Sequence, residues 1–238
     1  MDALTNPYTP NAGAEPQVIV GRDDQLKWFD LLLGRIARGR TEQSMIVTGL
    51  RGVGKTVLLG SFRTSALKQN WVVVELEVSK SDESSFRRDI ASRLRSALYE
   101  LAPRVKWSDR LTHAASVLRS FTLSVDPTGA WTAGMNVEVA DGYADHKNLA
   151  LDLTDLFLSI GEAANESKRG IVLLLDEVQF LRREQLEAVI EALHKMVQRK
   201  LPVTLVGAGL PQIAELAGDA KSYAERLFKF PRIGNLND

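Results

Sequence analysis

The segment that most constrains this chain is a short apolar run, residues 45–48, that leads directly into a glycine-rich loop and then into a helical pattern. The loop and the residue after it are Gly49, Leu50, Arg51, Gly52, Val53, Gly54, Lys55, Thr56 and Val57. This order matches the phosphate-binding pattern G-x4-G-K-[ST], in which glycines let backbone N–H groups turn inward around phosphate oxygens. The N-terminus of the following helix adds the positive end of its dipole. The segment therefore predicts a strand, a phosphate-binding loop (P-loop) and a helix, in that order.

Two side chains at the end of this loop carry the predicted chemistry. Lys55 would reach the β- and γ-phosphates of a nucleotide, and the hydroxyl of Thr56 would bind Mg²⁺. The alternative is a glycine-rich turn at the start of an ordinary helix that binds no ligand. We predict that residues 49–57 bind ATP or ADP together with Mg²⁺.

A second motif lies downstream, where the five apolar residues 171–175 are followed by Asp176 and Glu177. Such a run predicts a parallel strand buried on both faces, and ligands bind at the carboxyl ends of these strands. Asp176 is then placed to hold Mg²⁺, and Glu177 can polarise a water towards the γ-phosphate. The same letters could instead begin a helix, with a carboxylate as its N-cap. With the P-loop upstream, we predict Glu177 and Lys55 as catalytic residues.

Apolar patterns along the chain alternate between strand and helix. Helical spacing runs through residues 23–38, 86–101, 148–164 and 183–199, and strand patterns lie at 45–48, 71–78, 171–175, 203–206 and 227–230. This rhythm predicts an α/β fold, a central parallel five-stranded sheet flanked by helices. On the helix at 86–101, the spacing places Arg87, Arg88, Arg93 and Arg95 on the solvent side.

Residues 103–145 interrupt this rhythm and are predicted to be an insertion. Within them, Phe121, Leu123 and Val125 alternate with polar residues, a turn signature follows at 126–129, and alternation continues from Trp131 to 139. This is the pattern of a β-hairpin. Its apolar face would rest either on helices of its own domain or on a neighbouring subunit or protein partner.

The composition excludes several classes of protein. Thirty basic and thirty acidic residues balance, so nothing in the total charge asks for an obligatory nucleic-acid partner. The chain contains no cysteine, which excludes disulfides and thiolate–metal sites. Its first residues are polar and proline-rich, unlike a signal peptide, and no apolar run is long enough to span a membrane. We expect a cytoplasmic protein with an extended arm at residues 1–20.

The P-loop, the acidic pair and Val20-Gly21-Arg22-Asp23 ahead of the first helix resemble the AAA+ ATPases. The resemblance is strongest to initiator-like (origin-recognition type) and STAND-like ATPases, and implies an ATPase whose base domain spans residues 21–238. It also implies that Val20, Gly21 and Arg22 lie near the adenine, although these residues could equally form a plain helix-start turn. Arg226 lies where such ATPases carry an arginine finger that reaches a neighbouring subunit. The alternative for Arg226 is a surface ion pair with Glu225.

The sequence departs from the AAA+ pattern in two places. The strand at 203–206 continues into Gly207, Ala208 and Gly209, where these enzymes carry a polar sensor residue. A C-terminal helical lid is expected to be absent from this chain. Three functions stay open: an ATP hydrolase that drives assembly, a nucleotide-controlled switch or scaffold with little turnover, or the ATPase module of a DNA-engaging regulator. DNA would be engaged only through a region beyond these residues.

Overall fold

The computed structural model describes residues 21–103, 106–124, 126, 128 and 136–235, and the predicted arm at 1–20 lies outside them. Five strands form one sheet in the order β2-β3-β4-β1-β5, and every neighbouring pair is parallel. The strands are β1 (Ser44–Thr48), β2 (Val72–Glu77), β3 (Ile171–Asp176), β4 (Val203–Gly209) and β5 (Phe228–Lys229). The predicted five-stranded parallel sheet is confirmed.

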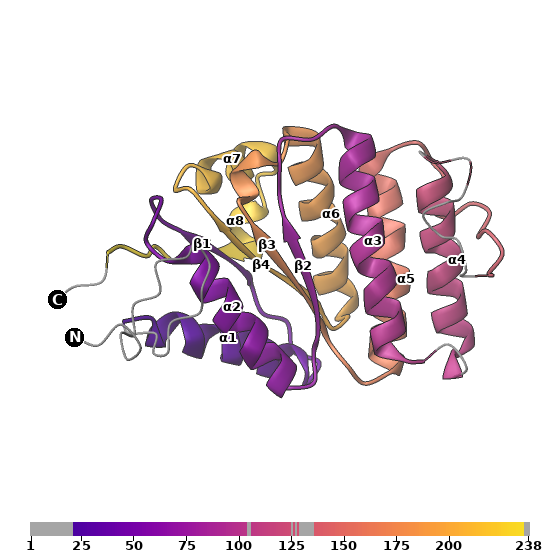
Figure 1. Ribbon diagram of the computed structural model, residues 1–238, viewed down its shortest axis with the longest axis horizontal. Helices are drawn as coiled ribbons and strands as arrows, with labels where there is room; N and C mark the ends of the chain where they lie inside the picture. The colour runs from indigo at the N-terminus through magenta and orange to yellow at the C-terminus, as the bar shows by residue number, and fades with distance from the viewer. Residues whose placement is uncertain (1–20, 104–105, 125, 127, 129–135, 236–238) are drawn as a thin grey trace, which may run out of the picture.

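Helices cover both faces of this sheet (Figure 1). One face carries α1 (Asp23–Ile36) and α2 (Lys55–Lys68). The other carries α3 (Glu83–Leu101), α5 (Leu149–Glu166) and α6 (Arg183–Arg199), with α4 (Asp109–Leu123) packed on α3 and α5, farther from the strands. Three short helices, η3 (Val178–Phe180), α7 (Ile213–Ala220) and α8 (Ala224–Leu227), complete the described part of the fold.

Burial on both faces explains why β3 reads as an unbroken apolar run. Ile171, Leu173 and Leu175 pack into the core beneath α3, α5 and α6. Val172 and Leu174 pack into the core beneath α1 and α2. Because successive side chains of a strand point to opposite faces, both sets must be apolar, and the alternation of a half-exposed strand is lost.

The predicted β-hairpin is wrong in the part that the structure describes. Phe121 and Leu123 belong to α4, and Phe121 is fully buried in the core. The buried apolar residues of this helix follow a helical period, which extends through the short stretch of alternation: Leu111, Ala114, Ala115, Leu118 and Phe121. Residues 137 and 139 are not in a strand, and Trp131 lies outside the described residues.

Arg87 is also placed differently from the prediction, since only 1% of it is exposed. Packing of α4 against α3 and α5 covers the part of α3 that carries Arg87, whereas Arg88 and Arg93 are exposed as predicted. Arg87 Nη2 pairs with Asp152 Oδ2 on α5 at 2.9 Å, and Arg87 Nε pairs with Glu83 Oε1 at 2.8 Å. The buried guanidinium of Arg87 thus joins α3 to α5.

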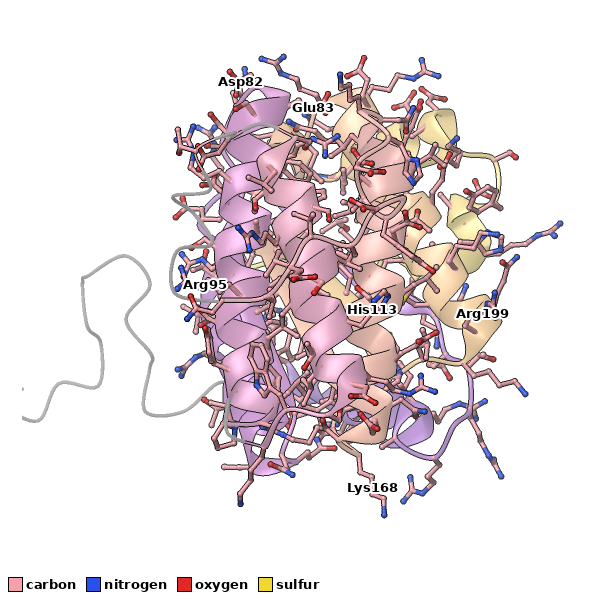
Figure 2. All side chains as sticks on the ribbon, turned by 90° about the vertical axis from the view of Figure 1, so that its right-hand side faces the viewer. Asp82, Glu83, Arg95, His113, Lys168 and Arg199 are labelled. Carbon is pink, nitrogen blue, oxygen red and sulfur yellow. The ribbon has the colours of Figure 1, made fainter. Side chains whose placement is uncertain are left out.

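Figure 2 faces the helical layer that α3, α4, α5 and α6 form on this side of the sheet. Asp82 and Glu83 lie at the end where α3 begins, and Lys168 lies at the opposite end, after α5. Asp82 caps α3, because its Oδ1 accepts a hydrogen bond from the backbone N–H of Ser85 at 2.8 Å. Helix α3 therefore begins at the edge of the sheet where β2 and β3 end, and the P-loop follows β1 at the same edge.

Candidate nucleotide-binding site

The P-loop connects β1 to α2 through backbone conformations that require glycine. Gly52 and Gly54 have φ values of 79° and 88°, in the left-handed region that side chains avoid. Gly49 is constrained by space, because a Cβ there would lie 2.6 Å from the carbonyl oxygen of Ile233. The backbone of 231–234 runs beside β1, where Ile233 N donates to Thr48 O at 2.8 Å. The loop is thus held between β1 and this segment.

Lys55 opens α2 and is only 7% exposed. Its Nζ donates to the carbonyl oxygens of Gly49 and Leu50 at 3.1 and 2.8 Å. Within the described residues it forms no ion pair. An ammonium has three N–H donors, so one is left for an anionic ligand in the cradle of the loop.

The two predicted metal-binding residues come from separate parts of the fold and meet at the end of the sheet. Thr56 Oγ1 donates to Asp176 Oδ2 at 2.6 Å. The other carboxylate oxygen, Asp176 Oδ1, accepts from the backbone N–H of Glu177 at 2.8 Å. A hydroxyl and a carboxylate are both oxygen ligands of the kind that Mg²⁺ binds together with waters and phosphates. This pair therefore fits a magnesium ion held next to the P-loop.

Glu177 follows β3 in a left-handed conformation, with φ 55° and ψ 38°. Such a conformation is uncommon for a residue with a side chain and costs on the order of 1 kcal/mol or more. The Glu177 carboxylate accepts a hydrogen bond from Gln179 Nε2, and Gln179 Oε1 accepts from the backbone N–H of Leu210 at 3.0 Å. The half-buried Glu177 thus directly follows Asp176 at the end of β3, and Gln179 holds its carboxylate.

Arg22, which the resemblance puts near the adenine, lies against the P-loop, and its guanidinium has partners within the chain. Arg22 Nη2 donates to Val53 O at 3.0 Å and to Gly234 O at 2.6 Å, and the residue is 8% exposed. Gly21 adopts a φ of 71°, while Val20 lies outside the described residues. Arg22 therefore ties the start of α1 to the loop and to the backbone near residue 234.

Arg226 lies near the end of the sheet where β1 begins, opposite the end that carries the P-loop. It precedes β5, whose Phe228 pairs with Ser44 at the start of β1, whereas Arg232 pairs with Thr48 beside the P-loop. Four residues of strand separate these two levels, about 13 Å. Arg226 is exposed and forms no ion pair with any residue that the structure describes, including Glu225. It is too far along the strand to serve the P-loop of its own chain.

Two parts of this edge were not found from the sequence. The 231–234 segment contacts Gly49 and Arg22 through backbone atoms, and such contacts cannot be predicted from a pattern of side chains. Gln179 follows the acidic pair by two residues, and that spacing was the only available signal.

The parallel sheet, the loop between β1 and α2 and the acidic pair after β3 define a P-loop nucleotide-binding fold. Residues 18–206 match the family profile described as the AAA ATPase domain, which is well over half of the chain. The chain therefore belongs to the AAA ATPase domain family.

One solved structure shows the same fold. Cdc6p from Pyrobaculum aerophilum superposes with a TM-score of 0.54 at 17% identity, over 94% of this chain and 48% of that protein. Two weaker likenesses, each with a TM-score of 0.45, are Aeropyrum pernix ORC1 in complex with DNA and the HORMA:CdnC:Trip13 complex of E. coli MS115-1. Their identities are 16% and 13%, over 93% and 92% of this chain and 47% and 64% of those chains.

The chain spans about half the length of the two archaeal proteins. No curated protein matches it in sequence. In the part of the chain that the structure describes, no helix is both long and apolar enough to cross a membrane.

Proposed function

We propose that this chain binds ATP or ADP with Mg²⁺ at residues 49–57 and hydrolyses ATP. The observation that carries the proposal is the 2.6 Å hydrogen bond between Thr56 and Asp176, which brings the end of the P-loop to the acidic end of β3. A cation held there would lie beside the phosphates that the loop cradles, the arrangement that phosphoryl transfer uses. Mg²⁺, when bound, supplies positive charge to the phosphate oxygens and fixes their orientation.

The residues of the chain divide the remaining work. Backbone N–H groups of the loop and the free N–H of Lys55 bind phosphate oxygens, and Lys55 stabilises charge that develops on them. Glu177 accepts the proton of a water that attacks the γ-phosphate. Arg22, braced against Val53, keeps the loop in place on the side where the resemblance puts the adenine.

We further propose that nucleotide binding governs assembly with a second copy of the chain. Arg226 is exposed and lies at the end of the sheet opposite its own P-loop, which supports a role toward the nucleotide of another subunit rather than its own. An arginine supplied in trans stabilises transition-state charge in related chemistry. A cytoplasmic location, where ATP is available, suits this activity.

A switch with little turnover is the second candidate. It is favoured by the bare end of β4, where Gly207, Ala208 and Gly209 offer no polar side chain to a water near the γ-phosphate. A DNA-engaging regulator is the third candidate, and it rests on family resemblance alone.

Steady-state ATP hydrolysis with and without Mg²⁺, at rising protein concentration and with added duplex DNA, separates these candidates. A hydrolase that assembles through Arg226 turns over faster per chain as concentration rises, and Arg226→Ala removes that rise. A switch binds ATP with turnover at background under every condition. A DNA-engaging module is stimulated by DNA.

Glu177→Gln provides the matched test of chemistry against binding. The amide keeps the shape and loses the basicity, so hydrolysis should fall by roughly 10²- to 10⁴-fold while ATP affinity stays as it was. Glu184→Gln, at an exposed position in the first turn of α6, is the control. If Glu177→Gln hydrolyses ATP at the parent rate, the general base lies elsewhere.

A further inference from the structure

At the end of β4, Gly207 and Gly209 have no free space for a side chain, because Val178 and Gln179 of η3 lie against them. A Cβ on Gly209 would lie 2.8 Å from both Gln179 Oε1 and Val178 Cγ2. A Cβ on Gly207 would lie 3.1 Å from Val178 Cγ1. The space that a polar residue of β4 would fill is therefore occupied by the two residues that follow Glu177.

Gln179 brings a polar group into that space. Its Nε2 donates to the Glu177 carboxylate, and its Oε1 accepts from Leu210 N at 3.0 Å. The partners fix the orientation of the amide, because the backbone N–H of Leu210 only donates and an ionised carboxylate only accepts. A single side chain thus connects the predicted general base to the backbone at the end of β4.

The connection matters because, among the described residues, the Glu177 carboxylate has no other hydrogen-bond partner. The Glu177 side chain has three rotatable bonds, and a base must be held within hydrogen-bond reach of the water it activates. Leu210 directly follows β4, whose Leu205, Val206 and Ala208 are buried in the two cores. Gln179 therefore connects the carboxylate to the end of a strand that is buried along its whole length.

We propose that Gln179 is the positioning residue for Glu177 and takes the place of the polar residue that β4 lacks. The inference rests on the proposed role of Glu177 as general base. Within the described residues, Gln179 forms no hydrogen bond with the P-loop or with the Thr56–Asp176 pair, so its effect falls on turnover rather than on nucleotide binding.

The test compares Gln179→Met, which keeps the length and loses both hydrogen bonds, with Gln179→Ala and with the parent protein. Loss of a residue that orients a reactive group lowers activity by roughly 10- to 100-fold. We expect kcat to fall by this amount in both variants, with the ATP dissociation constant and thermal midpoint unchanged. Gln198→Ala, at an exposed position on α6, is the matched control.

A readout independent of hydrolysis is amide hydrogen exchange at Leu210. Its N–H is bonded to Gln179 in the parent protein, so exchange at Leu210 should accelerate in Gln179→Met while its neighbours in β4 keep their protection. An unprotected Leu210 amide in the parent protein overturns the inference, whether or not the protein hydrolyses ATP.

The remaining outcomes separate this inference from the proposed function. If the parent protein hydrolyses ATP and Gln179→Met matches or exceeds its kcat, Gln179 does not position the base. If both variants lose ATP affinity and thermal stability in step with kcat, Gln179 is a packing residue and the inference is again overturned. If the parent protein binds ATP without hydrolysis, the proposed hydrolase activity is wrong. Hydrogen exchange at Leu210 then still decides whether Gln179 forms its hydrogen bond to the end of β4.

Discussion

Lys55 and Arg87 are both buried cations, yet the two regions that hold them treat the charge differently. Around Lys55, at the P-loop edge, the bonded atoms are the neutral carbonyl oxygens of Gly49 and Leu50. Around Arg87, in the α3–α4–α5 layer, they are the carboxylates of Glu83 and Asp152.

The Arg87 guanidinium also lies 4.9 Å from the centroid of the Phe121 ring, so it contacts all three helices of the layer. Its charge is compensated within the fold. Among the described residues Lys55 has no anionic partner, so one N–H and the positive charge are left for an anionic ligand. The comparison teaches that the partners of a buried cation, more than its burial, distinguish a structural site from a binding site.

The largest expected effect is on stability, in the helical layer. Arg87→Ala leaves Asp152, itself fully buried, without its cation, and breaking a buried pair in this way costs about 3–5 kcal/mol of unfolding free energy. Chemical denaturation measures the loss, and ATP affinity of the folded fraction should be unchanged.

Arg93→Ala, at an exposed position on the same helix, is the control and should change stability by less than about 0.5 kcal/mol. Replacing both partners, as Arg87→Met with Asp152→Leu, should recover much of the loss because no charge is then left buried. A loss of ATP affinity in Arg87→Ala without a loss of stability would undo the distinction between the two regions.

An intermediate effect is expected at the P-loop edge from Gly49→Ala. The new Cβ would lie 2.6 Å from Ile233 O, a backbone atom that cannot rotate away, so overpacking should cost about 1–3 kcal/mol. Because the shift falls on the loop itself, ATP affinity should fall together with stability.

Gly218→Ala in α7 is the matched control, since nothing lies within 4 Å of the added Cβ. An alanine within a helix stabilises by about 0.5–1 kcal/mol relative to glycine. Equal stability and affinity in Gly49→Ala and the parent protein would mean that the 231–234 segment does not brace the loop.

The smallest expected effect is a pH dependence confined to the helical layer. The hydrogen bond that His146 Nε2 donates to Asp155 Oδ2, 2.9 Å away, raises the pKa of His146 above its ordinary value near 6.5. The folded state therefore favours the protonated ring. This contribution is fully present below about pH 6.5 and is lost as the pH rises through the raised folded-state pKa.

Denaturation of the parent protein and His146→Gln at pH 6 and pH 8 tests the sign. The stability advantage of the parent should be larger at pH 6, and ATP affinity should show no such His146-linked difference. An advantage that grows towards pH 8 would contradict the His146–Asp155 interaction.

What the sequence predicts well is local. The P-loop needs glycine at Gly52 and Gly54 for reasons of backbone conformation, and β3 needs an apolar run because both of its faces are covered. Each pattern depends on only a few neighbouring residues. The five-stranded sheet and the placement of Asp176 at the same edge as Thr56 could therefore be predicted from the sequence.

What the sequence does not reveal depends on contacts between distant segments. Arg87 is buried because α4 packs over α3, and the three alternating residues from Phe121 imitate a strand although they extend a helical stripe that begins at Leu111. Gln179 has its partner at Leu210, and its amide lies against Gly209 of β4. Such roles become visible only once the strands are placed side by side.

Calorimetric titration of ATP with Mg²⁺ into the parent protein and Lys55→Ala tests the central claim most directly. Truncating one partner of a buried, charge-assisted hydrogen bond costs about 2–5 kcal/mol, so the variant should bind at least about 30-fold more weakly at unchanged unfolding free energy. Lys68→Ala, exposed at the far end of α2, should bind like the parent. Equal affinity in Lys55→Ala and the parent protein would contradict nucleotide binding at this loop.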